Sequence, residues 1–139
     1  MSNKERILIT GVTGFVGSHM LDYLVQNTHA EIFGFKRMNS QLRNIHHALK
    51  KIELFNGDLN DQTSIVKVLR EIKPTRIYHF GALSWVTPSW DMPGIYMMTN
   101  AIGTINLFEA VLNVDIEPRI LLSCTPEEFG DVPESMIPI

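Results

Sequence analysis

The sequence predicts an α/β protein with a doubly wound parallel sheet, which is a sheet covered by helices on both faces. Short apolar runs that read as strands alternate along the chain with longer segments of helical periodicity. The strand runs are continuously apolar, as is typical of strands buried on both faces. Three glycines, Gly11, Gly14 and Gly17, separate the first strand from the first helix. The 139 residues are enough for one core, so we expect residues 1–139 to form one domain.

The first half of the chain begins with a strand at about 6–11, where an apolar run stops at a glycine. An amphipathic helix follows at about 15–27, and a second apolar run predicts a strand at 31–35. A polar, basic stretch then extends to Lys51 before the third strand at 52–55.

The second helix is expected at about 62–72, because its apolar residues repeat at helical spacing and Asn60 or Asp61 can cap its first turn. Pro74 prevents the helix from extending further. The apolar run at 76–80 predicts the fourth strand.

The last part of the chain is expected to contain a loop with Pro88 and Pro93, a long helix at about 94–113 and a fifth strand at 119–123. The apolar face predicted for the long helix consists of Ile102, Ile105, Leu107, Phe108, Val111 and Leu112. Right-handed connections between these strands would place ligands at their carboxyl ends.

The junction between the first strand and the first helix predicts a dinucleotide site. Glycines let the backbone approach a pyrophosphate closely, and a helix N-terminus offers unpaired N–H groups with a partial positive charge. The alternative is a tight structural turn, but the strand before the glycines and the helix after them favour a phosphate site. The expected cofactor contacts in this loop are Gly11, Thr13, Gly14, Phe15, Val16 and Gly17.

Two basic residues, Lys36 and Arg37, follow the second strand, where a dinucleotide fold meets the adenosine ribose. An acidic residue there would bind a ribose 2′-hydroxyl, whereas arginine suits a 2′-phosphate. Since residues 35–38 include no acidic side chain, the sequence favours NADP over NAD as cofactor. The alternative is that the basic residues form a solvated loop.

The ends of the third and fourth strands supply further expected contacts. The Asp58 carboxylate can accept a hydrogen bond from an adenine amino group, with Leu59 against the ring, or Asp58 can merely shape a turn. The segment Phe80-Gly81-Ala82 and the nearby Ser84 would let backbone lie along the cofactor's riboses. Farther along, Trp85, Trp90 and Tyr96 are expected to be core or interface aromatics rather than a substrate platform.

The polar segment at 123–131 follows the fifth strand and contains Thr125 and Glu127. A hydroxyl can polarise a sugar alcohol or ketone, and a carboxylate can remove a proton next to a carbonyl. From the residues alone, a polar exit from a strand into a loop is the stronger interpretation.

Composition excludes several classes of function. A net charge of −3 does not indicate a nucleic-acid partner. No apolar run reaches the roughly 18 residues that span a membrane, and no secretory signal precedes the first strand. The single cysteine, Cys124, excludes an internal disulfide and fits a reducing, cytoplasmic compartment, and we expect it to be a small buried thiol. The histidines show no metal-ligand spacing, so no metal site is predicted.

With these residues in view, the chain resembles the N-terminal part of an extended short-chain dehydrogenase/reductase, a member of the nucleotide-sugar epimerase and dehydratase family with a Rossmann fold. The resemblance runs from about residue 6 to the C-terminus, and it implies that Asn100 also contacts the cofactor. The motifs that carry it are the 11–17 glycine loop, Gly57-Asp58-Leu59, Phe80-Gly81-Ala82, the segment 100–110, and the segment from Thr125 to Gly130.

Within that family the second strand, Gly34-Phe35-Lys36-Arg37, is similar to the NADP-binding strand of the GDP-mannose 4,6-dehydratases. The chain departs from their pattern at Phe15-Val16 and at Ile95, where they usually carry a cofactor-contacting tyrosine. Pro126 also replaces the aspartate or serine that dehydratases commonly carry between their threonine and glutamate, so the resemblance implies no acid role at that position.

The resemblance implies a 4,6-dehydratase that acts on a nucleotide sugar such as GDP-mannose. Hydride would leave C4 for NADP⁺, water would be lost across C5 and C6, and hydride would return to C6. Thr125 would bind the C4 oxygen and Glu127 would be the base at C5. The alternatives are a 4-epimerase or 4-keto reductase of the same family, or a non-catalytic dinucleotide-binding module.

The family's Tyr-x-x-x-Lys pair is expected after Thr125, and none of Tyr23, Tyr78 and Tyr96 has a lysine four residues later. We therefore expect this chain to be a fragment, with a sheet truncated after about five strands, that turns over no nucleotide sugar. Uncovered apolar surface would favour self-association, so a homo-oligomer is expected.

Overall fold

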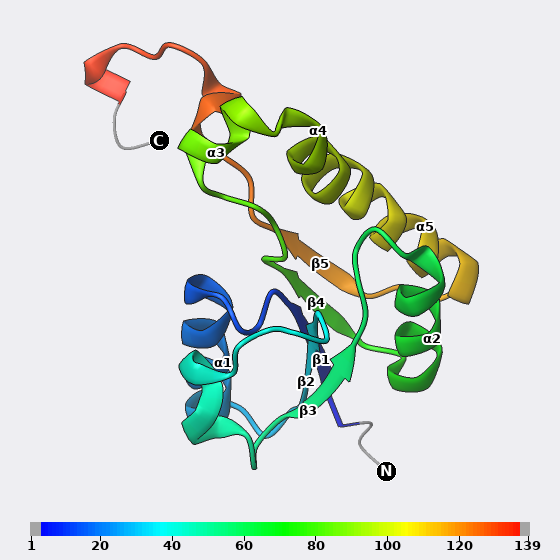
Figure 1. Cartoon of the computed structure of the whole chain (residues 1–139). Coiled ribbons are helices and arrows are strands. Elements are labelled where there is room, and N and C mark those ends of the chain that lie inside the picture. Colours follow the sequence, from blue (N-terminus) through cyan, green and yellow to red (C-terminus); the bar gives the residue numbers. More distant parts are fainter. Residues whose placement is uncertain (1–3, 137–139) are drawn as a thin grey trace.

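The computed structural model describes residues 4–136, except for the side chains of residues 126 and 127. Its centre is one sheet of five parallel strands in the order β3-β2-β1-β4-β5 (Figure 1). The strands are β1 (Arg6–Thr10), β2 (Glu31–Lys36), β3 (Glu53–Asn56), β4 (Arg76–His79) and β5 (Arg119–Leu122). This confirms the doubly wound parallel sheet. The order reverses between β1 and β4, and ligands bind at such a switch point.

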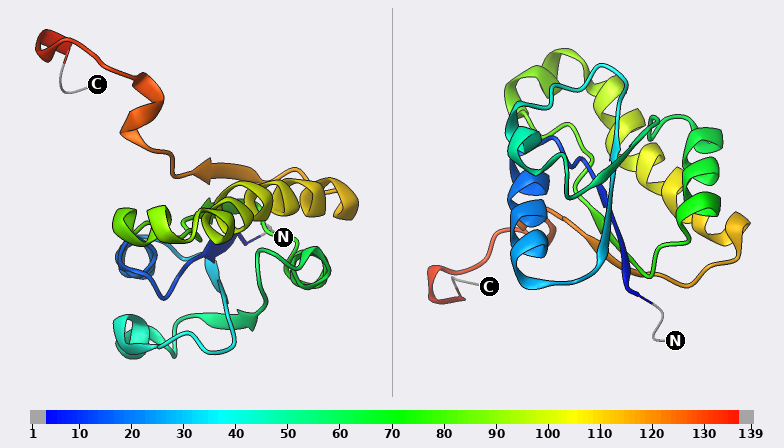
Figure 2. Two further views of the ribbon diagram at one scale, coloured as in Figure 1. Left: turned by 45° about the horizontal axis from the view of Figure 1, so that its top comes forward. Right: turned by 90° about the horizontal axis from the view of Figure 1, so that it is seen from below.

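Helices cover both faces of the sheet (Figure 2). The first face carries α1 (Phe15–Asn27) and a short 3₁₀ helix, η1 (Arg43–Ala48), and the second carries α2 (Gln62–Ile72) and α5 (Gly103–Val114). Successive residues of β1 divide between the two cores. Ile7 and Ile9 pack with Leu21 on the α1 side, whereas Leu8 packs with Leu107 on the α5 side.

The stretch before α5 is helical, where the sequence suggested a loop. It contains α3 (Val86–Asp91), α4 (Pro93–Tyr96) and a π-helical segment, Met97–Ile102, that leads directly into α5. Pro88 lies in the first turn of α3 and Pro93 opens α4, and at these places a missing N–H costs no helix hydrogen bond. Both prolines therefore sit at helix starts rather than in a loop.

The apolar face predicted for the long helix is only partly buried. Leu107 and Val111 face α2 and the sheet, together with Gly103 and Ala110. On the other side, where no described element packs, four predicted core residues are 39–72% exposed, namely Ile102, Ile105, Phe108 and Leu112.

The edge strand β5 is likewise exposed, with Leu121 and Leu122 at 46% and 40%. Cys124, just beyond it, is also exposed, so the expectation of a buried thiol was wrong. Trp85 and Trp90 are exposed as well and belong to no core of the described residues.

The helical stretch Pro93–Val114 is 22 residues long and contains an 18-residue window with a mean hydropathy of 1.2, so by length and composition it could cross a membrane. The expectation that no apolar run is long enough overlooked this stretch, because polar residues such as Asn100 and Asn106 interrupt it. One side of it packs against α2, as the helix of a core does, so we take it as part of the α/β fold.

Candidate functional site

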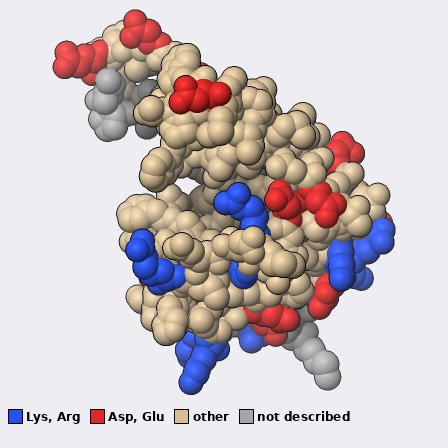
Figure 3. Space-filling view, in the orientation of Figure 1, with Lys and Arg blue, Asp and Glu red and all other residues tan. Residues whose placement is uncertain are grey.

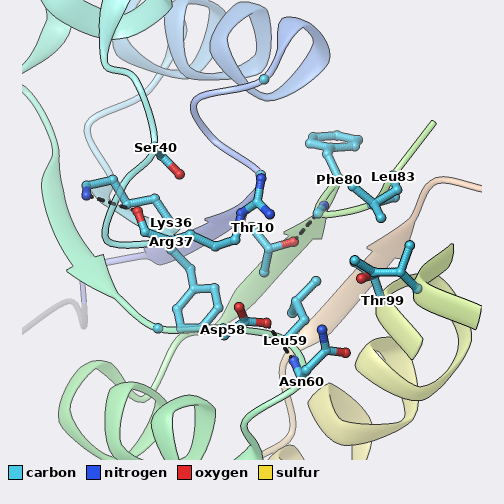
Figure 4. Close-up of a pocket in the computed structure, with 17 residues that line it drawn as sticks. Thr10, Lys36, Arg37, Ser40, Asp58, Leu59, Asn60, Phe80, Leu83 and Thr99 are labelled. Carbon is cyan, nitrogen blue, oxygen red and sulfur yellow. Dashed lines mark hydrogen bonds between the residues drawn. The ribbon is translucent and has the colours of Figure 1, made fainter. Parts of the chain in front are cut away.

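A pocket of about 330 Å³ opens at the carboxyl ends of the central strands (Figure 4), and the molecular surface is hollowed beside basic side chains on one face (Figure 3). It lies at the β1–β4 switch point predicted for a ligand. Nine of the residues expected to contact the cofactor line it, namely Gly11, Gly14, Lys36, Arg37, Asp58, Leu59, Phe80, Gly81 and Ala82.

The glycine loop requires glycine at positions 11 and 17, because a side chain at either position would collide with the backbone. Gly11 has a φ of +67°, and a Cβ there would lie 2.6 Å from the Phe80 carbonyl oxygen. A Cβ on Gly17 would lie 2.3 Å from the Gly11 carbonyl oxygen. The loop is therefore packed between β4 and α1 as closely as backbone allows, and Gly17 serves this packing without lining the pocket.

The N-terminus of α1 is open to a ligand. Gly14 is its N-cap, no side chain caps the helix, and its first turn holds no acidic residue. The loop itself is fixed, because the Gly14 N–H donates to the Gly11 carbonyl at 2.9 Å and the Asn44 side chain donates to the Thr13 carbonyl at 3.0 Å. Amide groups left free at such a helix end suit an anion.

Besides Gly17, three expected contacts of this loop do not line the pocket. The Thr13 carbonyl accepts a hydrogen bond from the Asn44 side chain, while Phe15 and Val16 are 76% and 52% exposed. The ring of Phe15 lies 4.5 Å from that of His19, centroid to centroid. If these residues contact a ligand, their backbone amides are the groups available at the helix end.

The two basic residues after β2 behave differently. The Lys36 amine donates to Asn56 Oδ1 at 2.7 Å and to the carbonyls of Arg37 and Met38. Arg37 extends into the pocket (Figure 4), and its guanidinium makes no hydrogen bond or ion pair with the described residues. Arg37 is thus the cation available to an anionic ligand.

Asp58 and Leu59, which follow the end of β3, form one wall of the pocket. The Asp58 carboxylate accepts the Asn60 N–H at 2.9 Å, so it shapes a turn while also lining the pocket. Leu59 is 8% exposed and packs into the core. Both interpretations of Asp58 therefore fit its position.

The opposite wall is the segment 80–83. Asn100, in the π-helical segment, accepts the Leu83 N–H and donates to the Leu83 carbonyl, both at 2.8 Å. It therefore supports this wall rather than lining the pocket, and Ser84 is exposed beyond it.

Sequence reasoning missed several residues that line the pocket: Thr10, Phe35, Ser40, Gly57, Asn60, Leu83, Ile95 and Thr99. Most of them adjoin strand ends that were already recognised. Ile95, in α4, had been noted only as the position where the family usually carries a cofactor-contacting tyrosine, and Thr99, in the π-helical segment, was not noted at all.

The expected catalytic residues follow β5, where the chain leaves the sheet (Figure 2). Thr125 is exposed and does not line the pocket. The Glu127 side chain lies outside the described residues. The charge of Glu128 raises the pKa of the nearby Cys124 thiol, which disfavours a nucleophilic thiolate. Within the described part of the chain, no three His, Cys, Asp or Glu side chains are grouped to hold a metal ion.

Comparison with known proteins gives a consistent result. Residues 8–138 match the model of the family described as GDP-mannose 4,6 dehydratase. Over 95% of its length the chain is 32% identical to a GDP-mannose 4,6-dehydratase of Vibrio cholerae, and over 91% it is 33% identical to the human GDP-mannose 4,6 dehydratase. The chain spans 38% and 37% of the length of these relatives.

Solved structures agree on the fold. A UDP-glucose 4-epimerase of Thermus thermophilus in complex with NAD superposes with a TM-score of 0.80 at 29% identity, over 93% of this chain and 40% of that one. A dTDP-glucose 4,6-dehydratase of Streptomyces venezuelae, with NAD bound, gives 0.74 at 24% identity, over 83% of this chain and 38% of the other.

Proposed function

The chain belongs to the GDP-mannose 4,6-dehydratase family, and from this premise we propose that it is the dinucleotide-binding part of a nucleotide-sugar 4,6-dehydratase. We also propose that residues 1–139 act as one domain. The observation that carries the proposal is the pocket at the β1–β4 switch point, with the uncapped N-terminus of α1 at its edge.

The residues present fit a dinucleotide. The glycine loop and the first turn of α1 would hold the pyrophosphate, since Gly11 and Gly14 line the pocket and no side chain caps the helix. The wall formed by Asp58 and Leu59 would hold the adenine, and the segment 80–83 would lie along the riboses. When bound, the cofactor supplies a hydride acceptor.

Arg37 supports NADP rather than NAD. Its guanidinium reaches the pocket without a partner among the described residues, and Ser40 lies on the same side of the pocket (Figure 4). A planar guanidinium suits a 2′-phosphate, and the wall contains no acidic residue at 35–38 that would repel one.

The substrate we propose is a nucleotide sugar of the GDP-mannose kind, as the names of the relatives suggest. Thr125 would bind the C4 oxygen and Glu127 would take the C5 proton. Their support is the family resemblance and the position of the segment beyond the carboxyl end of β5.

Calorimetric titration with NADP⁺ and NAD⁺ tests the proposal. Gly14→Ala places a methyl group in the pyrophosphate cradle and should weaken both dinucleotides about tenfold, which corresponds to about 1.4 kcal/mol. Gly94→Ala is the matched control, since a Cβ there meets nothing within 4 Å. If wild type binds neither dinucleotide, or if the two variants bind equally well, the proposal is wrong.

We further propose that these 139 residues alone do not turn over a nucleotide sugar, because none of their tyrosines has a lysine four residues later. Product formation by a preparation whose mass matches these 139 residues would refute this. A cytoplasmic location and a homo-oligomeric state are also proposed, from the single free Cys124 and the exposed apolar side of α5.

A further inference from the structure

A buried histidine, His79, contacts the pocket residue Thr10 but does not itself line the pocket. It ends β4 and is 3% exposed, and its neighbour in the β1–β4 register, Thr10, is 1% exposed. Thr10 Oγ1 lies 2.7 Å from its Nδ1, and Thr104 Oγ1 lies 3.2 Å from its Nε2. The imidazole therefore bridges β1 to the first turn of α5.

The partners fix the direction of each hydrogen bond. Thr10 Oγ1 accepts the Gly81 N–H at 3.1 Å, so its own hydrogen is available for His79 Nδ1. The Thr104 hydroxyl donates to the Asn100 carbonyl at 2.6 Å, because a carbonyl can only accept, so Thr104 Oγ1 accepts from His79 Nε2. A neutral ring with its hydrogen on Nε2 satisfies every group in this chain.

Both ends of the chain of hydrogen bonds reach the same pocket wall. At one end Thr10 holds the Gly81 N–H, as the dashed line in Figure 4 shows. At the other end Thr104 holds Asn100, whose side chain binds both backbone groups of Leu83. Gly81 and Leu83 both line the pocket.

We infer that His79 is a positioning residue for dinucleotide binding, because its neutral Nε2–H form fixes the 81–83 wall through Thr10 on one side and through Thr104 and Asn100 on the other. This inference rests on the proposed function. Burial lowers the pKa of His79 to about 4, so the ring stays neutral near neutral pH.

Thr104→Val tests the inference without touching the pocket. Valine keeps the shape of threonine but removes the hydroxyl between His79 and Asn100. It thereby removes both hydrogen bonds of that hydroxyl, and we expect the Kd for NADP⁺ to rise about fivefold as the 81–83 wall loses this support. Thr63→Val, at an exposed position in the first turn of α2, is the matched control and should leave the Kd within about twofold.

The Kd is measured under conditions in which urea titration shows every variant to be folded. If Thr104 and His79 contributed only to the stability of the fold, the Kd would therefore not change. His79→Phe, which removes both ring nitrogens, should weaken binding at least as much. A substitution at the buried His79 can unfold the chain. The inference is therefore judged on the Kd of Thr104→Val, because Thr104 is partly exposed.

Nitrogen NMR of the histidine rings gives an independent readout, in which His79 should show a neutral ring protonated at Nε2. In Thr104→Val, the Leu83 amide should exchange faster than in wild type. A ring protonated at Nδ1, or an unchanged Kd in Thr104→Val while wild type binds, overturns this inference alone. A wild type that binds no dinucleotide overturns the proposed function and this inference with it.

Discussion

At the residue scale, the two adjacent cations Lys36 and Arg37 have separate roles. Lys36 is held by Asn56 and by two backbone carbonyls, whereas Arg37 reaches the pocket unpaired among the described residues. The sequence identified both as candidates because it shows their order after β2. It could not show which amine or guanidinium would be occupied by neighbouring groups, since Asn56 comes from another strand.

Arg37→Ala should therefore weaken NADP⁺ binding by about 1.5–3 kcal/mol, the range for hydrogen bonds to charged groups, and barely affect NAD⁺. Lys36→Ala is the neighbouring control and should have a smaller effect on NADP⁺. Calorimetry with both dinucleotides measures the difference. Equal losses of NADP⁺ and NAD⁺ binding in Arg37→Ala would show that the guanidinium does not read a 2′-phosphate.

His79 also predicts a pH dependence of stability. Burial lowers its pKa from 6.5 to about 4, so between these values the unfolded chain binds a proton that the folded chain does not. Its contribution is constant above about pH 6.5 and is lost as the pH falls toward 4, by about 3 kcal/mol in total.

Urea unfolding of wild type and His79→Asn at several pH values isolates this contribution. The stability difference between them should shrink as the pH falls from about 6.5 to about 4. A difference that stays constant over that interval would mean that His79 titrates normally in the folded chain.

At the element scale, prediction succeeded where both ends of a helix carry local signals. The bounds of α1 and α2 match the expected 15–27 and 62–72. The glycine loop begins α1, whereas α2 follows an Asp61 cap and ends at Ile72, where the C-cap residue Lys73 has a φ of 46° just before Pro74. Sequence periodicity could not reveal η1, α3 or the π-helical segment, because each is too short to show a repeat of its own.

The cap of α2 gives a direct test at this scale. Asp61 Oδ1 accepts the Thr63 N–H at 3.0 Å, and Asp61→Ala should lower the free energy of unfolding by about 1 kcal/mol. Gln62→Ala, one residue later, is the control and should change it by less than about 0.5 kcal/mol. Urea titration compares the two, and similar effects would show that the cap hydrogen bond is not stabilising.

At the scale of the whole molecule, the pocket forms because parallel strands end at one edge and their order reverses there. Strand ends can be recognised in the sequence, so most of the pocket was predictable. The directions of side chains were not, so the sequence could not show that the side chains of Phe15 and Val16 are exposed and leave only their backbone amides for a ligand. Burial of the last helix was overestimated for a related reason, since periodicity does not tell which face of Ile105 or Leu112 meets a neighbour.

The exposed apolar side of α5 predicts that the isolated chain self-associates. Ile105 is 52% exposed, and Ile105→Lys should shift sedimentation profiles toward the monomer. Tyr23→Lys, at a 61% exposed position of α1, is the control and should leave the profile unchanged. A concentration-independent monomer in wild type would contradict the prediction.

The central claim is that a dinucleotide lies across the β1–β4 switch point, against the amides that open α1. Mapping backbone amide shifts during titration with NADP⁺ tests it most directly. We predict that the largest shifts fall in the segments 11–17, 37–40, 58–60 and 80–83. Shifts centred elsewhere, for example around Arg6 and Glu71 at the opposite edge of the sheet, would contradict it, as would no shifts at all.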